Sequence, residues 1–348
     1  MPHPAAALAC AALVFAPSAL ALPSGVQGGV DACANLNRLP ITFRFGTGAT
    51  PSAAPTVAAD GTAYIGTSEG YLHAVRPDGS YLWGYTLKGA VTGRAAVGAS
   101  GAVLVPTERR IYAIRPDGTL LWVFNSPIRV LGDLVRDGLG RFNFASDDGR
   151  LFALSGMGAL VAHVPGRVPF SALPVALGDG AIAAGRKDGS VLVARGFKTV
   201  RFELGRPARS LFPCPGHDLC AITAGSLQGV GSSAPRWQVS ALRAAASPDS
   251  VAVLVDERHL LLYRGATGEP EFRLELPDAA GEAPAFDAKG RIFVPLTGGA
   301  LLVVSPLGVP LACTQIGHSP LGLPVPDGAR GRVLVTASEG VLASVELP

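Results

Sequence analysis

Charge is scarce in this sequence, and neither sign dominates. Only 16% of the 348 residues are charged, and 29 Lys and Arg nearly balance 26 Asp and Glu, which leaves a formal charge of +3. A nucleic-acid-binding protein needs a concentrated basic face. We therefore expect no nucleic-acid partner. Hydrophobic residues make up 48% of the chain, which excludes a disordered protein.

Long hydrophobic runs are also missing. The apolar run Ala5–Ala16 is far shorter than the roughly 20 residues of a membrane helix, so we predict no transmembrane segment. It leads into Ala19-Leu20-Ala21, which is typical of signal peptidase cleavage, although no Lys or Arg precedes it. We predict a signal peptide over residues 1–21 and an exported protein, periplasmic or secreted; the alternative is a buried apolar N-terminal segment. Lipid anchoring at Cys10 is not expected, because the apolar run before it is too short.

Cysteines are few, and none are adjacent. Without Cys10 the chain has an even number, which favours disulfides in an exported protein: Cys33, Cys214, Cys220 and Cys313. Three connectivities exist, and the spacing favours Cys214 with Cys220 and Cys33 with Cys313. The alternative is free buried cysteines. Zinc binding at His217 is disfavoured, because no second pair of Cys or His ligands accompanies it.

What the sequence does have is an internal repeat. Residues 61–85 and 101–125 share Arg-Pro-Asp-Gly and Leu-Trp at the same positions, 40 residues apart. Further copies begin at Gly140, Gly180, Ser250, Gly290 and Gly331, and a degenerate copy from Leu219 fills the widest gap, which makes eight units. No segment sustains a helical period, which excludes a helical solenoid.

Each unit holds short apolar or alternating runs separated by turn residues. In the first unit the predicted strands are Pro55–Ala59, Thr62–Thr67, Tyr71–Arg76 and Ser80–Thr86. Four strands in about 40 residues is typical of a β-propeller blade. We predict an N-terminal segment over residues 22–39 and an all-β propeller over residues 40–348. Eight four-stranded blades are expected, with seven as the alternative.

The two ends of the propeller are expected to meet. The last unit ends without an outermost strand, whereas residues 40–48 form an extra strand before the first unit. Pairing the two closes the ring and removes exposed strand edges, so we expect a monomer. A Cys33–Cys313 disulfide would tie this strand to a neighbouring blade.

Aromatic residues recur at one place in the unit. We interpret these residues as packing against the neighbouring blade: Trp83, Trp122, Trp237 and Phe272. The alternative is a stacking platform for a ligand, which repetition around the ring disfavours. The Pro-Asp-Gly turns at 77–79 and 116–118 are likewise structural.

The unit from Ala59 to Trp83 resembles the pyrroloquinoline-quinone (PQQ)-type propeller repeat. The resemblance rests on Ala-Asp-Gly-x-Ala-Tyr-Ile-Gly-Thr, on Leu-x-Ala-Val-x-Pro-x-Gly and on the final Leu-Trp. Such repeats build quinoprotein dehydrogenases and also the eight-bladed outer-membrane assembly scaffold BamB. The resemblance therefore implies the fold and leaves both an enzyme and a scaffold open.

The sequence lacks the residues that the enzyme interpretation requires. A quinoprotein dehydrogenase would imply adjacent cysteines and a Ca²⁺ site of Glu, Asn and Asp, but this chain has no Cys-Cys and only four Asn. We interpret the acidic doublets Asp147-Asp148 and Asp256-Glu257 as solvated hairpin tips. The histidines are scattered over five units, and no Gly-x-Ser-x-Gly occurs in a suitable context. We expect no catalytic residue, no cofactor and no metal.

The remaining interpretation is a non-catalytic scaffold that binds another protein, with envelope or outer-membrane protein assembly as the candidate role; the sequence does not identify the partner. The stretch Leu211–Leu242 departs most from the repeat. Five arginines near it form either a patch for an anionic partner or ordinary solvated side chains: Arg201, Arg206, Arg209, Arg236 and Arg243. The alternative function is a propeller that binds a small molecule or quinone and acts as a dehydrogenase, hydrolase or lyase.

Overall fold

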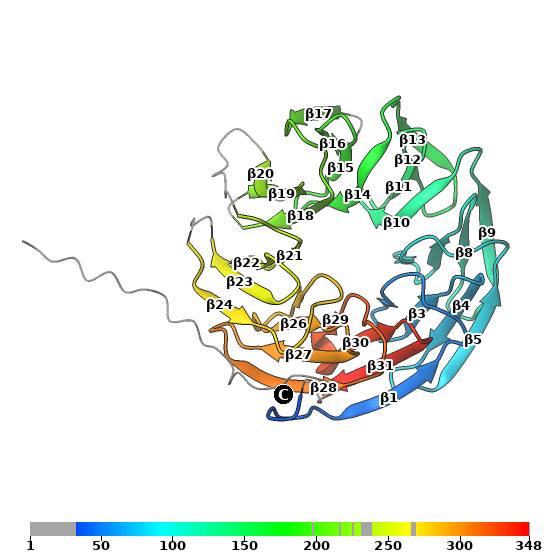
Figure 1. Ribbon diagram of the computed structural model, residues 1–348. Helices are drawn as coiled ribbons and strands as arrows, with labels where there is room; N and C mark the ends of the chain where they lie inside the picture. Colours follow the sequence, from blue (N-terminus) through cyan, green and yellow to red (C-terminus); the bar gives the residue numbers. More distant parts are fainter. Residues whose placement is uncertain are drawn as a thin grey trace, which may run out of the picture.

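The computed structural model describes residues 33–196, 198–215, 217–224, 226–230, 239–265 and 269–347. Its β-sheets are arranged side by side as a ring (Figure 1). This arrangement is an eight-bladed β-propeller, as the repeat predicts. The degenerate stretch after Gly205 forms a blade of its own, which decides between eight blades and seven. The predicted signal peptide and Cys10 lie outside the described residues.

The blades follow one another along the chain, and we number them in that order. Blade 1 contains β2 (Thr56–Val57), β3 (Ala63–Gly66), β4 (Tyr71–Val75) and β5 (Tyr81–Thr86). Blade 2 contains β6 (Ala96–Val97), β7 (Val103–Pro106), β8 (Arg110–Ile114) and β9 (Leu120–Asn125). Blade 3 contains β10 (Val130–Arg136), β11 (Phe142–Ser146), β12 (Leu151–Leu154) and β13 (Leu160–Val164). Blade 4 contains β14 (Phe170–Ala176), β15 (Ile182–Arg186), β16 (Ser190–Arg195) and β17 (Lys198–Glu203).

The second half continues the same pattern. Blade 5 has three strands within the described residues, β18 (Ser210–Cys214), β19 (His217–Thr223) and β20 (Ser226–Val230). Blade 6 contains β21 (Arg243–Ala246), β22 (Ser250–Leu254), β23 (His259–Arg264) and β24 (Phe272–Glu275). Blade 7 contains β25 (Ala285–Phe286), β26 (Ile292–Pro295), β27 (Ala300–Val304) and β28 (Pro310–Gln315). Blade 8 contains β29 (Val325–Asp327), a 3-10 turn (Gly328–Arg330), β30 (Arg332–Ala337), β31 (Val341–Glu346) and, from the other end, β1 (Ile41–Gly46).

Blade 8 closes the ring with strands from both ends of the chain. Its strand order is β1-β31-β30-β29, and β1 runs antiparallel to β31 with Phe45 opposite Leu342. Thr42 Oγ1 also donates a hydrogen bond to Ser344 Oγ at 2.8 Å. The predicted closure is confirmed.

The core lies in layers between neighbouring blades. Strands in the middle of a blade are covered by a blade on each side, so they are buried on both faces and read as continuous apolar runs. Between blades 2 and 3, for example, Leu104 and Ile111 pack in one cluster with Phe142, Phe144 and Phe152. Because every layer joins two blades, each blade depends on both neighbours for its buried surface.

The repeated aromatic residues contact the glycine turn of the next blade. The Trp83 indole nitrogen donates to the carbonyl oxygen of Pro116 at 2.7 Å, and Trp122 does the same to Gly156 at 3.2 Å. The Phe272 ring lies against Gly308 in blade 7. Phe43, which the repeat does not predict as a docking residue, lies against Gly79 in the same way across the closure. Trp237 lies outside the described residues.

Gly158 offers a test of this packing. Its φ is +81°, and a Cβ on it would lie 2.7 Å from the Trp122 ring. We expect Gly158→Ala to lower the free energy of unfolding by about 1–2 kcal/mol, since an L-residue is strained there before any clash is counted. Gly156→Ala in the same turn is the control, because no atom lies within 4 Å of its Cβ position. Equal urea denaturation midpoints for the two variants would contradict the role assigned to Trp122.

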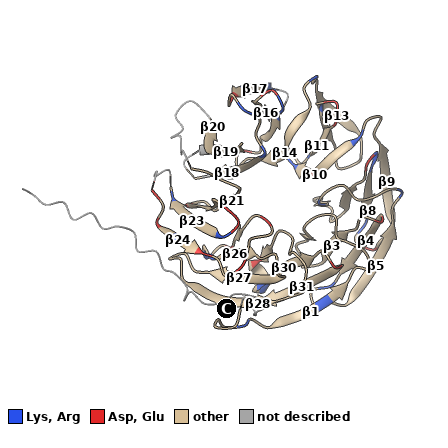
Figure 2. Ribbon diagram, in the orientation of Figure 1, with Lys and Arg blue, Asp and Glu red and all other residues tan. Residues whose placement is uncertain are grey.

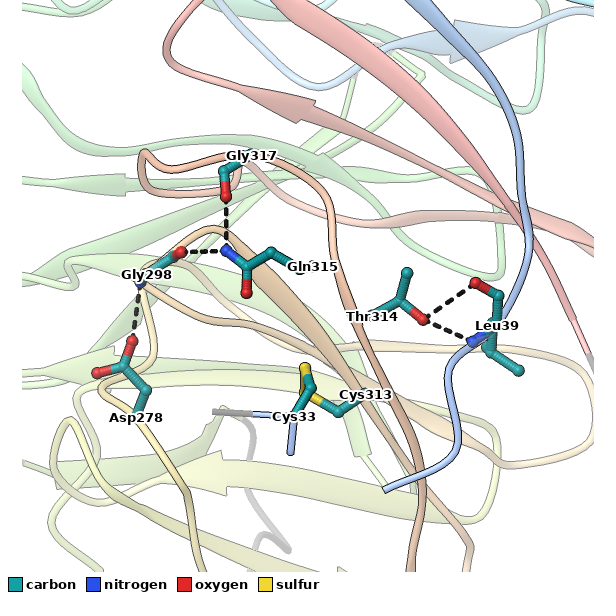
Figure 3. The surroundings of a disulfide bond; sticks show 8 residues. All are labelled: Cys33, Leu39, Asp278, Gly298, Cys313, Thr314, Gln315 and Gly317. Atoms are coloured by element: carbon teal, nitrogen blue, oxygen red, sulfur yellow. Dashed lines mark hydrogen bonds between the residues drawn. A yellow bond between two sulfur atoms is a disulfide. The ribbon is translucent and has the colours of Figure 1, made fainter. Parts of the chain in front are cut away.

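The N-terminal segment is held covalently to blade 7. Cys33 and Cys313 form the predicted disulfide, and both are fully buried (Figure 3). Next to it, Leu39 N donates to Thr314 Oγ1 at 2.8 Å, and that hydroxyl donates back to Leu39 O. Cys220 is also disulfide-bonded. The side chain of its predicted partner, Cys214, lies outside the described part, so this pairing stays a prediction.

Candidate binding site

The inner strands of blades 8, 1, 2, 3 and 4 line a cavity of about 780 Å³ in the central channel. Its wall is mixed in character, with Val57, Val135, Val175 and Val325 beside charged side chains. Arg136, the last residue of β10, and the 3-10 turn Gly328–Arg330, which follows β29, also line it. We call this space the wide cavity. A second cavity, of about 270 Å³, is lined by residues that precede the inner strands, among them Pro51, Ala53 and Leu323.

An ion pair separates the two cavities. Arg94 and Asp133 line both of them. The Arg94 backbone N–H donates to Asp133 Oδ1 at 2.6 Å, and the guanidinium Nε lies 3.6 Å from Asp133 Oδ2. Glu282 lines the second cavity and pairs with Arg243 at 3.6 Å. Both carboxylates that face this end of the channel therefore have a cationic neighbour.

Asp327 lines the wide cavity, accepts a hydrogen bond from Arg332 and forms an ion pair with Arg330. Arg332 Nε lies 3.0 Å and Arg330 Nη1 lies 3.5 Å from this carboxylate. The Arg332 side chain is buried, and its other nitrogens donate to Gly61 O at 2.8 Å and Pro77 O at 2.7 Å, both in blade 1. Arg330 also donates to Ala59 O, at 2.7 Å. These two side chains therefore link blade 8 to blade 1 at the edge of the channel.

Arg136, at the end of β10, differs from the other arginines of the wide cavity. Within the described residues it has no carboxylate in ion-pair range and no hydrogen-bond acceptor for its guanidinium. The turn after it carries Leu139, whose side chain is 71% exposed. An arginine that lines the cavity is thus followed, three residues later, by an exposed apolar side chain in the adjoining turn.

A second exposed apolar surface runs over the outer strands of blades 2 and 3. We call it the outer patch: Leu120, Leu121, Met157, Leu160 and Val161. Strands β9 and β13 belong to neighbouring blades (Figure 1). Met157, 87% exposed, lies in the turn that receives Trp122 of β9. Large exposed apolar side chains gathered on two neighbouring outer strands are candidates for a protein-binding surface.

The histidines are not brought together. Burial lowers the pKa of His73, whose ring packs edge-on against Phe45 of β1, so this side chain belongs to the core of the closure. His163 lies on the outer strand β13, and His259 pairs with Asp256 at 2.8 Å in a hairpin. His318 lies in the turn after β28, and the side chain of His217 lies outside the described part. The described residues hold no group of three or more His, Cys, Asp or Glu placed to bind a metal.

The acidic doublets lie at hairpin tips, as interpreted. Asp147-Asp148 connects β11 to β12, and Asp256-Glu257 connects β22 to β23. Asp148 pairs with Arg150 at 2.9 Å.

The predicted arginine group is not one uniform patch. Arg201 pairs with Asp188 and Glu203, and Arg243 pairs with Glu282. Arg206 and Arg209 are exposed in the connection between blades 4 and 5, and Arg236 lies outside the described residues. Charges of both signs are spread around the ring (Figure 2).

The channel residues were missed at the sequence level, although part of the signal was present. Three units begin with Gly-Arg, at Gly140, Gly290 and Gly331. In each of these units the arginine pairs with an aspartate at the start of the same turn, and the pairs are Asp137–Arg141, Asp287–Arg291 and Asp327–Arg332. Arg94, Asp133 and Arg136 carry no such repeated signal.

This geometry defines an all-β, eight-bladed propeller with a partly charged channel and an exposed apolar outer edge. Within the described residues, no helix has the length and apolar character needed to cross a membrane. Residues 68–198, from blade 1 into blade 4, match the family described as outer membrane protein assembly factor BamB. The expected resemblance is confirmed over that stretch. No curated protein sequence matches the chain.

Solved structures of the same fold are similar over most of the chain. BamB from Moraxella catarrhalis has a TM-score of 0.73 and 17% identity, and the match covers 89% of this chain and 100% of that one. Sqt1 from Saccharomyces cerevisiae has a TM-score of 0.72 and 13% identity over 90% and 100%. The computationally designed Ika8 protein has a TM-score of 0.70 and 14% identity over 87% and 98%. At such identities the similarity is one of fold.

Proposed function

We propose that this protein is an exported, non-catalytic scaffold that binds another protein in the cell envelope. The observation that carries the proposal is the outer patch, which exposes five apolar side chains within the stretch that matches the BamB family. A rigid ring whose loops and edges vary suits protein recognition. The signal-like residues 1–21 support export, and the family match supports a role in outer-membrane protein assembly.

In-cell crosslinking tests the proposal. The tagged full-length protein is crosslinked in cells, purified, and its partners are identified by mass spectrometry. Recovery of β-barrel assembly components, with crosslinks on blades 2 and 3, is the expected result. Recovery of no stable partner would contradict the scaffold and favour the alternative of a small-molecule-binding propeller, for which a PQQ plus Ca²⁺ titration is the next measurement.

The outer patch gives a sharper prediction. We expect the double variant Met157→Glu/Leu160→Glu to reduce partner recovery at least tenfold, because a charge at an apolar contact must be desolvated on binding. Leu307→Glu is the matched control, since Leu307 is 75% exposed in the corresponding turn of blade 7. If both variants recover the partner as well as the unmodified protein does, the outer patch is not the binding surface.

A further inference from the structure

We propose that the wide cavity receives an acidic segment of the partner protein, with a carboxylate on Arg136 and an apolar side chain against Leu139. This inference rests on the scaffold proposal and names the chemistry of a second contact. The outer patch lies on the outer strands, whereas Arg136 lines the wide cavity and Leu139 lies in the turn that follows it. A partner that uses both would be held at two separated points.

The charges of the wide cavity favour an anionic occupant. Its carboxylates are already engaged, because Asp133 pairs with Arg94 and Asp327 is shared by Arg330 and Arg332. The guanidinium of Arg136 has no such partner in the described chain. Three arginines and two aspartates line the cavity, so its guanidinium groups exceed its carboxylates by one. A carboxylate fits a guanidinium with two parallel hydrogen bonds, which gives orientation as well as attraction.

The apolar features favour a peptide over a small anion. A volume of about 780 Å³ with valine and proline walls accommodates side chains rather than a lone ion. Leu139 lies three residues beyond Arg136 in the adjoining turn and is exposed to solvent. A molecule contained in the cavity would leave this leucine uncovered. A polypeptide that continues out of the cavity would cover it.

A defined peptide tests the inference on the full mature chain. The probe is fluorescein-labelled Glu-Leu-Glu-Leu-Glu-Leu amide, followed by fluorescence anisotropy, with Gln-Leu-Gln-Leu-Gln-Leu amide as the uncharged comparison. We expect Arg136→Gln to weaken binding of the acidic probe about tenfold, and Leu139→Ser to weaken it a few-fold. The affinity of Arg136→Lys should lie between those of the unmodified protein and Arg136→Gln, because lysine keeps the positive charge and loses the two parallel N–H donors. Arg206→Gln, which removes an exposed arginine away from the channel, should leave binding unchanged.

Three results would overturn the inference. One is equal binding of the acidic probe to the unmodified protein and to Arg136→Gln, with thermal melting showing that both are folded. Another is equal binding of the acidic and uncharged peptides. The third is displacement of the probe by inorganic phosphate at the same concentration as by unlabelled peptide, which would assign the cavity to a small anion. None of these results bears on the in-cell crosslinking. A failure of the channel contact can therefore be told apart from a failure of the scaffold proposal.

Discussion

Replacing Arg332 with Met lowers the free energy of unfolding by about 3–5 kcal/mol, because the change leaves the buried Asp327 carboxylate without its closest cation. The same side chain donates to Gly61 O and Pro77 O, so two carbonyls of blade 1 lose their donor as well. Urea denaturation followed by tryptophan fluorescence measures the loss.

The control for Arg332 is an arginine whose ion pairs face water. Arg201 bonds Asp188 and Glu203, but its side chain is half-exposed, so Arg201→Met should cost less than about 1 kcal/mol. Equal losses of unfolding free energy for the two variants would show that burial of Arg332 and its contacts across the closure do not contribute to stability. Asp327→Leu combined with Arg332→Met should be milder than Arg332→Met alone, because no buried charge is left unpaired.

Removing the Cys33–Cys313 disulfide by changing both residues to Ala should lower the free energy of unfolding by about 3–5 kcal/mol. The bond joins positions 280 residues apart, and chain-entropy accounts assign the largest effects to such long loops. Because both sulfurs are fully buried, reductant should act on the unfolded chain much faster than on the folded one. Thiol labelling in native buffer and in urea checks that difference.

Thr314→Val separates the covalent link from the hydrogen bonds beside it. The variant keeps the disulfide and removes the hydroxyl that bonds Leu39 in both directions. We expect it to cost about 1–2 kcal/mol. A loss as large as that of the cysteine variant would mean that the hydrogen bonds, and not the disulfide, hold the N-terminal segment.

Local signals explain why the fold could be predicted. Three of the four strands of blade 1 match the predicted runs to within one residue at each end, because Ser-Glu-Gly and Pro-Asp-Gly mark the turns directly. The innermost strand is the exception: β2 spans only Thr56–Val57, shorter than the predicted Pro55–Ala59. The ring closure followed from counting strands, which needs no knowledge of distant contacts.

The channel could not be predicted in the same way. The inner strands of blades 1, 2 and 7 are two residues long, too short for any periodicity to show. Strand β10, which carries Asp133 and Arg136, is longer, but its pairing is irregular between Leu131 and Val135. Arg136 and Arg330 share a cavity only because the ring brings blades 3 and 8 around one axis. Phe43 was missed for a related reason, since it acts as the docking aromatic of a blade whose other strands lie at the opposite end of the chain.

The pairing of β1 with β31 also sets an order of events during synthesis. Thr42 and its partner Ser344 are separated by 302 residues, so β1 waits unpaired until almost the whole chain has been made. Blades 1 to 7 can form earlier from contiguous segments, each meeting its neighbour as it emerges. During that interval the open ring presents unpaired strand edges, the kind of surface that promotes association between nascent chains. The step that completes the ring is therefore the one with the longest loop to close and the greatest exposure to misassembly.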